Sequence, residues 1–221
     1  MANINKPFGF SPVKSLIGGG FNEQGRLYAI PTTDTTNSYA VGDVVMSAAG
    51  SDANGVRYVQ KWGGVTTTSA LPLGIVVGIR VANPGVSLVG NSLALEKSYL
   101  AAATVTYVRY VYVVDDPMVE FIAQFDSTGA TAAQLSNNAA VTISAANQTS
   151  LANSAPLSDM VLTGPATTAT LPVRLLGAWQ SPENVVTTAA SPYVKVLCKW
   201  NYHEYGVIGS ASGTVVSYLA V

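Results

Sequence analysis

Few side chains in this sequence have the types and spacing that chemistry requires. The only histidine, His203, lies in the run Asn201-Tyr-His-Glu-Tyr205. A His followed by a Glu occurs in zinc hydrolases, but their motif needs a second His one helical turn later, and none follows here. A general base would also need a nucleophile and an orienting group, and the sequence places neither beside it. We expect His203 to be a structural or interface residue.

The carboxylates of Asp115, Asp116 and Glu120 form the second candidate. Paired carboxylates can hydrolyse glycosides or bind calcium. Asp115-Asp116-Pro117 is also a turn signature, and we expect the turn. The single cysteine, Cys198, allows no intrachain disulfide and is expected to be a small buried side chain. We predict no catalytic residue, no metal site and no cofactor, and a hydrolase that combines the histidine with the carboxylates is the least favoured hypothesis.

The longest strand signal is Tyr107–Asp126, which reads YVRYVYVVDDPMVEFIAQFD. Side chains in a strand alternate between faces, so this segment can bury one face and leave the other half-exposed. We expect two long antiparallel strands, divided by the Asp-Asp-Pro turn, at the centre of a β-sheet core. Tyr107, Tyr110 and Tyr112 could line a sugar-binding face, although cross-strand packing explains them more simply.

Other segments repeat this alternation between short turns. They are Arg26–Pro31, Val44–Met46, Val56–Trp62, Leu73–Val81, Leu171–Trp179 and Tyr193–Trp200. A total of roughly nine or ten strands with turns at short intervals is typical of a sandwich or barrel. We predict an all-β fold with a β-sandwich or jelly-roll-like core, an extended N-terminal arm and long loops.

Composition and turn residues divide the chain into four parts. Prolines and unpatterned apolar residues predict an extended arm at the start, and its folding back on its own domain remains an open alternative. A long stretch rich in Ala and Thr interrupts the strand pattern. The parts are 1–21, the N-terminal arm; 22–126 with 171–208, the β-sandwich core; 127–170, an insertion or outer loop; and 209–221, a C-terminal docking tail.

The chain is poor in charge. Charged residues make up 10% of it and hydrophobic residues 48%, and the formal net charge is −1. Since a typical soluble domain has about 25% charged residues, we expect partners to cover much of this surface. No basic stretch could follow a phosphate backbone, which argues against nucleic acid. No apolar run is long enough for a membrane span, and the start of the chain lacks the apolar core of a secretory signal.

Several segments carry a likeness to a known family. They are Lys6–Lys14 with the glycines at 18–20, Arg26–Pro31 followed by Tyr39–Val45, Pro72–Gly78, Asp115–Pro117 with Phe121–Phe125, and Val194–His203. Together they resemble the head decoration, or capsid cement, proteins of tailed bacteriophages, especially podovirus-like phages. The resemblance covers most of the chain but not clearly residues 127–170.

The resemblance implies a non-enzymatic structural protein of the virion, made in the bacterial cytoplasm and bound to the outer surface of the capsid. Such proteins bridge neighbouring major capsid subunits as dimers or trimers. Removal of residues 1–20 is expected to leave a folded core that no longer binds capsids. The alternative is a glycan- or surface-binding β-module of a phage or bacterium. The expected capsid-binding residues are Pro7, Phe8, Phe10, Pro12, Leu16 and Ile17.

Overall fold

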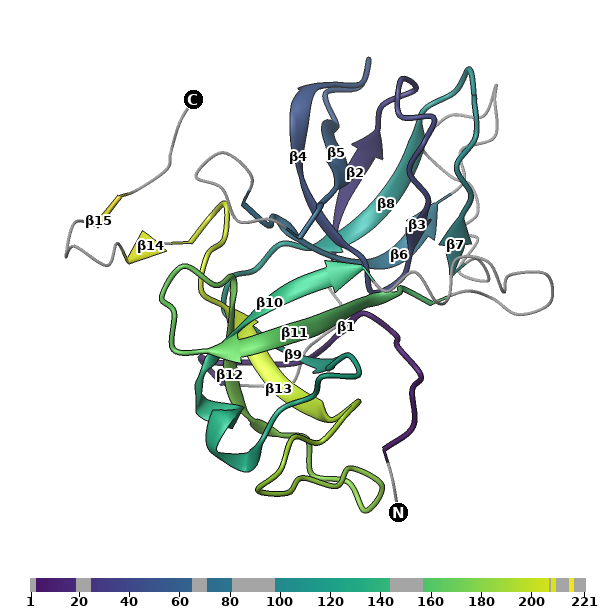
Figure 1. The fold of residues 1–221 in the computed structure, drawn as a ribbon. Helices are drawn as coiled ribbons and strands as arrows, with labels where there is room; N and C mark the ends of the chain where they lie inside the picture. Colours follow the sequence, from purple (N-terminus) through teal and green to yellow (C-terminus); the bar gives the residue numbers. More distant parts are fainter. Residues whose placement is uncertain are drawn as a thin grey trace.

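The computed structural model describes residues 3–18, 25–64, 71–80, 98–143 and 157–206, and the backbone of residues 208–209 and 215–216. Two β-sheets dominate this part of the chain and lie one above the other in Figure 1. The prediction of an all-β fold with a sandwich-like core is confirmed, because the one helix among the described residues is a short 3-10 turn, η1 (Ala132–Ser136). No described helix has the length and hydropathy needed to cross a membrane.

The upper sheet is a closed five-stranded barrel. In spatial order its strands are β2 (Arg26–Ile30), β5 (Arg57–Lys61), β4 (Val44–Ser51), β6 (Gly74–Arg80) and β8 (Arg109–Val114), which pairs with β2 again. Alternation along these strands sends one face of each into the barrel. The interior includes Tyr28, Ile30, Val45, Val59, Val76, Ile79, Val111 and Val113, each no more than 1% exposed.

The lower sheet has six strands and curls back on itself. Its order is β1 (Phe10–Ser15), β9 (Val119–Gln124), β13 (Lys195–Trp200), β12 (Val173–Ala178), β10 (Asn138–Ile143) and β11 (Met160–Ala166). Phe125, the residue after β9, forms a bridge with Leu162 of β11, which brings the far edge of the sheet back towards β9. Two short pairs complete the strands: β3 (Tyr39–Ala40) with β7 (Tyr99–Leu100), and β14 (Ile208–Gly209) with β15 (Val215–Val216).

An aromatic cluster at Trp200 joins the two sheets. Its indole packs against Phe10 of β1, Phe121 of β9 and Trp62, which follows β5, at ring-centroid distances of 5.3, 5.8 and 6.3 Å. All four rings belong to one buried cluster of apolar residues. Aromatic rings bury large apolar areas, so this cluster stabilises the contact between barrel and sheet.

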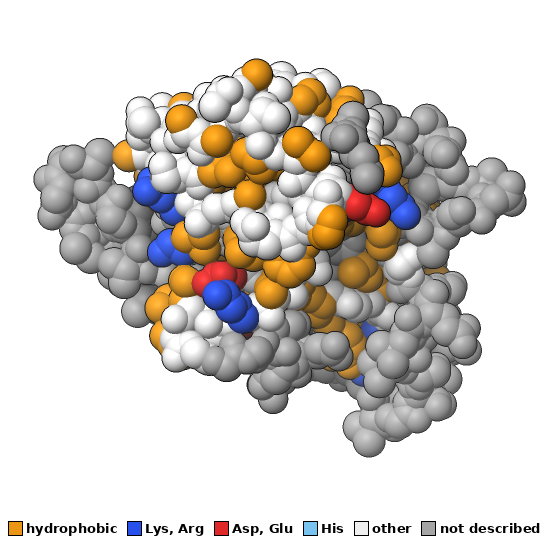
Figure 2. All heavy atoms as spheres, turned by 90° about the horizontal axis from the view of Figure 1, so that it is seen from below, with side chains coloured by type: hydrophobic (Ala, Val, Ile, Leu, Met, Phe, Trp, Pro, Cys, Tyr) orange, Lys and Arg blue, Asp and Glu red, His pale blue; other side chains and the backbone are white. Residues whose placement is uncertain are grey.

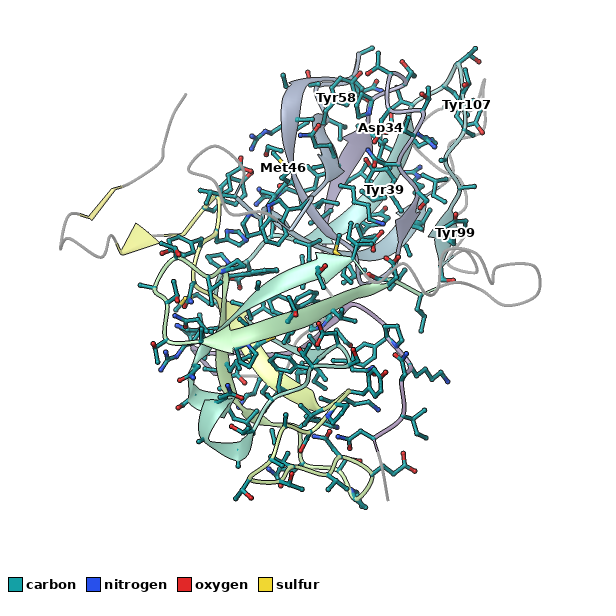
Figure 3. All side chains as sticks on the ribbon, in the orientation of Figure 1. Asp34, Tyr39, Met46, Tyr58, Tyr99 and Tyr107 are labelled. Atoms are coloured by element: carbon teal, nitrogen blue, oxygen red, sulfur yellow. The ribbon has the colours of Figure 1, made fainter. Side chains whose placement is uncertain are left out.

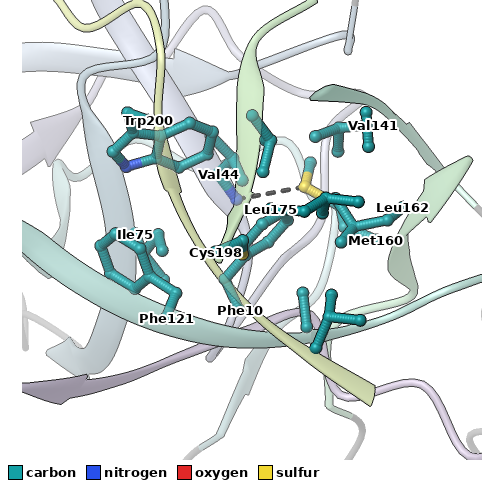
Figure 4. Close-up of a cluster of buried hydrophobic side chains, with 14 of the residues drawn as sticks. Phe10, Val44, Ile75, Phe121, Val141, Met160, Leu162, Leu175, Cys198 and Trp200 are labelled. Carbon is teal, nitrogen blue, oxygen red and sulfur yellow. Dashed lines mark hydrogen bonds between the residues drawn. The ribbon is translucent and has the colours of Figure 1, made fainter. Parts of the chain in front are cut away.

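The barrel wall supplies further residues to this shared core. Val44, Ile75 and Val114 point out of the barrel and lie in the same cluster as the inner face of the lower sheet. The backbone N–H of Val44 also donates to the sulfur of Met160 on β11, at 3.1 Å (Figure 4). The outer wall of the barrel and the lower sheet therefore share one core, and the barrel interior forms a second.

The strands β8 and β9 form where the sequence predicts them, but they do not pair with each other. β8 lies between β2 and β6 in the barrel, and β9 lies between β1 and β13 in the lower sheet. The chain passes between the sheets at a turn in which Asp116 accepts the backbone N–H of Met118 (2.8 Å). The expected central hairpin is therefore wrong. Alternation identifies a strand and its buried face, whereas tertiary packing selects its hydrogen-bond partner.

The described part of the N-terminal segment is not a free arm. β1 pairs antiparallel with β9 as an edge strand of the lower sheet, and Phe10 is only 2% exposed. Pro12 is tolerated there because an edge strand does not need every backbone N–H. The expectation of an extended arm over residues 1–21 is therefore wrong for residues 10–15, which form a strand of the lower sheet. Packing Phe10 against its own core removes apolar surface from water without any partner.

Two glycines let this segment approach the barrel closely. Gly9 and Gly42 have φ of 72° and 95°, and a Cβ on Gly9 would lie 2.3 Å from the carbonyl oxygen of Gly42. The backbone N–H of Phe10 donates to that same carbonyl (3.0 Å). A side chain on either glycine would prevent this contact between two backbones.

The Ala/Thr-rich stretch 127–170 is part of the lower sheet, which corrects its expected role as an insertion or outer loop. Its described residues, 127–143 and 157–170, include η1, β10 and β11. Met160 and Leu162 are fully buried in the shared core. The sequence predicts a short strand at Ala140–Ser144, which overlaps β10. Small residues conceal β11, because few large side chains mark its buried face. Of the expected docking tail 209–221, the structure describes only the backbone of Gly209 and Val215–Val216.

Replacing Trp200 with Ala should lower the free energy of unfolding by about 3–5 kcal/mol, as expected for loss of a buried aromatic side chain. The matched control is Leu157→Ala, because Leu157 is 43% exposed, and a change of less than about 0.5 kcal/mol is expected there. Urea denaturation followed by circular dichroism measures both. Equal losses in the two variants would contradict the central position of Trp200.

Candidate functional site

A polar network at one side of the barrel includes one of the predicted carboxylates, Asp115. The phenol of Tyr28 donates to Asp115 Oδ2 (2.7 Å), and Arg26 forms an ion pair with the same oxygen (3.0 Å). The hydroxyl of Tyr205 lies 3.3 Å from that of Tyr28 and accepts a hydrogen bond from Arg57 (2.5 Å). Burial, with the hydrogen bond to Asp115, raises the pKa of Tyr28, so its phenol is neutral near pH 7.

Glu204 forms the second branch of this network. Its Oε1 accepts hydrogen bonds from Ser47 (2.7 Å) and Arg57 (3.1 Å). Its backbone N–H donates to the carbonyl of Pro72 (3.0 Å). These contacts hold residues 203–206, which follow β13, against strands β2, β4 and β5. The network therefore connects the end of the lower sheet to the barrel.

The histidine in this segment, His203, is buried. It is 2% exposed, and its Nδ1 accepts the backbone N–H of Tyr205 (3.1 Å). Burial lowers the pKa of His203 to about 4, although the nearby Asp115, Glu204 and the backbone of Leu73 oppose this shift. The ring is neutral at pH 7 and carries its proton on Nε2. With Nδ1 occupied by a backbone N–H, His203 is placed to hold a turn, as expected of a structural residue.

The three predicted carboxylates do not converge. Asp115 contacts Tyr28 and Arg26, Asp116 caps the turn, and Glu120 pairs with Lys14 at 3.5 Å. The turn interpretation is confirmed for Asp116. Within the described ranges, no three His, Cys, Asp or Glu side chains lie close enough to hold a metal ion.

The single cysteine is buried, as the sequence predicts. Cys198 is fully inaccessible on the inner face of β13. Burial raises the pKa of its thiol, with a smaller contribution from the charge of Glu120. A buried thiol with a raised pKa is a poor nucleophile, so Cys198 acts as a small core residue.

The three tyrosines proposed for a sugar-binding face differ in accessibility. Tyr110 is 4% exposed, and its hydroxyl donates to Asp52. Burial and this hydrogen bond raise the pKa of Tyr110 to about 12. Tyr112 and Tyr107 are half-buried, and Tyr107 lies at the outer end of the barrel (Figure 3). They do not form one open aromatic face.

The six predicted capsid-binding residues divide between core and surface. Two are accessible: Ile17 is 78% exposed and Leu16 is 38% exposed. The backbone N–H of Leu16 donates to the carbonyl of Met118 (2.8 Å), whose side chain is 41% exposed. We call Leu16, Ile17 and Met118 the apolar tip. The other four are less accessible: Pro7 and Phe10 are buried, and Phe8 and Pro12 are half-buried.

The molecular surface is poor in charge, as the composition predicts. Figure 2 shows one face of the molecule, on which the charged side chains of the described residues are few and lie among hydrophobic ones. The sequence matches no protein-family model and no curated protein. We therefore infer the function from the surface chemistry of this chain.

Most residues of the polar network could not be predicted from the sequence. Tyr28, Ser47, Arg57 and Tyr205 carry no local motif, and Ser47 is 157 positions from its partner Glu204. The only local signal was the aromatic and acidic composition around His203. Long-range pairing of this kind becomes visible only when the fold brings the segments together.

Replacing His203 with Gln should reduce the acid sensitivity of the protein. The pKa of His203 is about 4 in the folded state against 6.5 for an unperturbed histidine, so the unfolded state binds more protons between these values. The neutral ring stabilises the fold fully above pH 6.5, and this contribution is lost as the pH falls towards 4. The loss amounts to about 3 kcal/mol.

Urea denaturation at pH 7 and pH 4 tests this for both proteins. The wild type should lose about 3 kcal/mol more than His203→Gln between these pH values. The carboxylates of the chain are common to both proteins and cancel in the comparison. An identical pH dependence in the variant would show that His203 is not held neutral by burial.

Proposed function

We propose that this chain is a structural virion protein that decorates and stabilises a phage capsid by bridging major capsid subunits. It is not an enzyme in this proposal, and its place is the outer surface of the capsid. The partner is the major capsid protein, and the free protein self-associates as a dimer or trimer. Nucleic acid and membrane are not partners.

The apolar tip is the observation that carries this proposal. Large apolar side chains grouped on a solvent-exposed surface often mark a binding site. Leu16 and Ile17 follow the edge strand β1, at the end of the segment whose sequence resembles decoration proteins. Their position next to Met118 gives them a firm base on the lower sheet, because β9 begins immediately after that residue.

The charge-poor surface and the compact double-sheet body support the same proposal. A protein that is covered on several sides in a long-lived assembly needs fewer charges for solubility than a free monomer. Many weak contacts, repeated over a shell, stabilise the assembled state through multivalency and mass action. A body in which the barrel wall and the lower sheet share a core is suited to bridging subunits without deforming.

The glycan-binding alternative receives less support. It relied on Tyr107, Tyr110 and Tyr112, and the hydroxyl of Tyr110 is already bonded to Asp52 inside the protein. Ligand stacking needs an open aromatic ring, and Tyr110 offers only 4% of its surface.

The structure changes the experiment that tests the proposed function. Deletion of residues 1–20 would remove β1 and the buried Phe10, so loss of binding could follow from loss of folding. Substitution of the two exposed residues avoids this problem. Leu16→Ser with Ile17→Ser should reduce co-sedimentation with purified expanded capsids by at least about tenfold while changing stability by less than about 0.5 kcal/mol.

Ile143→Ser is the matched control, because Ile143 is also an exposed isoleucine, at 40%, but lies away from the apolar tip at the end of β10. It should bind capsids like the wild type. Full decoration by the double variant would show that the apolar tip does not dock on the shell. If the wild-type protein does not co-sediment with capsids, the proposed function itself is overturned.

A further inference from the structure

The outer face of the lower sheet collects positive charge from four neighbouring strands. Lys14 on β1 is paired in register with Glu120 on β9, and Lys199 on β13 with Arg174 on β12. Lys199 follows Cys198, the partner of Phe121, so it lies beside Glu120. One row across the sheet therefore reads Lys14, Glu120, Lys199 and Arg174. All four side chains point away from the shared core, because the alternate residues of these strands fill it.

An apolar row and a further cation follow along the same face. Ile122 is in register with Leu197, and Leu176 lies in the bulge beside them and is 41% exposed. The next row contains Lys195, in register with Gln124. Lys195 and Lys199 are four residues apart, so the two cationic rows are separated by about 14 Å at ~3.4 Å per residue. We call this surface the basic face: Lys14, Arg174, Lys195 and Lys199, with Ile122, Leu176 and Leu197 between them.

The charge of the basic face differs from that of the whole chain. Four cations against the single carboxylate of Glu120 give +3, while the chain has a net charge of −1, so the remainder carries −4. The one ion pair on the face joins Lys14 to Glu120. In the described part of the chain, no carboxylate lies within ion-pair distance of Lys195, Lys199 or Arg174.

The main contacts of β9, β13 and β12 are with each other and with β1, β10, β11 and η1. The N-terminal segment covers part of this face at the Lys195 row, where Gln124 is 1% exposed and donates to Asn5 (3.5 Å). Lys14 and Arg174 are exposed, and Lys195, Leu197 and Lys199 are half-buried. Arg174 donates to Asn138 (3.4 Å), but Arg174, Lys195 and Lys199 have no carboxylate partner among the described residues. Their arrangement around an apolar row is complementary to a surface with carboxylates around an apolar centre.

We propose that the basic face docks on an acidic protein surface. This rests on the proposed function, under which that surface belongs to the major capsid subunit. The apolar row favours a protein partner over nucleic acid. A nucleic acid bound here would place its phosphates against the apolar side chains of Leu176 and Leu197 and against the carboxylate of Glu120. The basic face carries no aromatic side chain on which a base could stack. Charge complementarity of this kind gives register and rapid association.

The test measures binding of the full chain at 50 mM NaCl to three probes: purified expanded capsids, poly-L-glutamate and a short duplex DNA. Arg174→Glu with Lys195→Glu reverses two charges of the basic face. This variant should bind capsids and poly-L-glutamate at least about tenfold more weakly. Wild-type binding to both should weaken as the NaCl concentration rises, because salt screens surface charges.

Two further variants control for charge and folding. Lys6→Glu makes the same change as Lys195→Glu at an exposed lysine outside the basic face, and should stay within about twofold of the wild type. Lys195→Gln removes charge without adding a carboxylate to the sheet, and should weaken binding in the same direction. Thermal unfolding followed by circular dichroism verifies that each variant is folded.

The outcomes separate this proposal from the proposed function. Capsid binding that is unaffected by Arg174→Glu with Lys195→Glu would overturn the basic face and leave the decorating role intact. If the wild type binds poly-L-glutamate through Arg174 and Lys195 but does not bind capsids, docking of the basic face on an acidic partner is supported and the decorating role is overturned. Tighter binding to the DNA through the same residues would overturn a protein partner. Light scattering tests one more outcome. If the wild type binds neither capsids nor poly-L-glutamate, and the variant loses a dimer or trimer that the wild type forms, the basic face contacts a second copy of the chain.

Discussion

The contact between the barrel wall and the lower sheet is the constraint on which the rest of the structure depends. Trp200 contacts Phe10 and Phe121 of the sheet and Trp62 at the end of a barrel strand. Each sheet buries one face here, and neither has another apolar partner for that face among the described residues. The polar network of Tyr28, Asp115 and Glu204 lies beside this contact and holds the segment after β13 on the barrel. Hydrophobic burial supplies the stability, and the directional hydrogen bonds fix the relative position.

This constraint decides which surfaces remain for partners. Because β1 is part of the sheet, the N-terminal segment cannot leave it without exposing Phe10. What it offers is the apolar tip, at the point where β1 ends. The basic face begins two residues before Leu16, at the pair of Lys14 and Glu120. An apolar tip and a charged face on one rigid sheet can contact a partner together, with no loss of backbone freedom on binding.

The sequence predicted strands well where large β-branched and aromatic residues alternate. β2, β5, β6, β8, β9, β12 and β13 all fall within the expected segments. β1 and β11 were missed because Pro12 interrupts the pattern of β1, and Gly164 and Pro165 interrupt that of β11 within an Ala/Thr-rich stretch. Their places come from tertiary packing of Phe10, Met160 and Leu162, which no local pattern reveals. The same holds for His203: its neutral, buried state follows from residues that lie far away in the sequence.

The order of the strands along the chain has a consequence for biosynthesis. All barrel strands lie between residues 26 and 114, whereas the lower sheet combines residues 10–15 with strands from 119 to 200. As the chain leaves the ribosome, the barrel can close while the sheet is still being made. β1 emerges first, yet its partner Ala123 for Phe10 emerges only after the whole barrel. The first strand to be synthesised is therefore among the last to be secured, and Phe10 remains exposed to water or to chaperones until then.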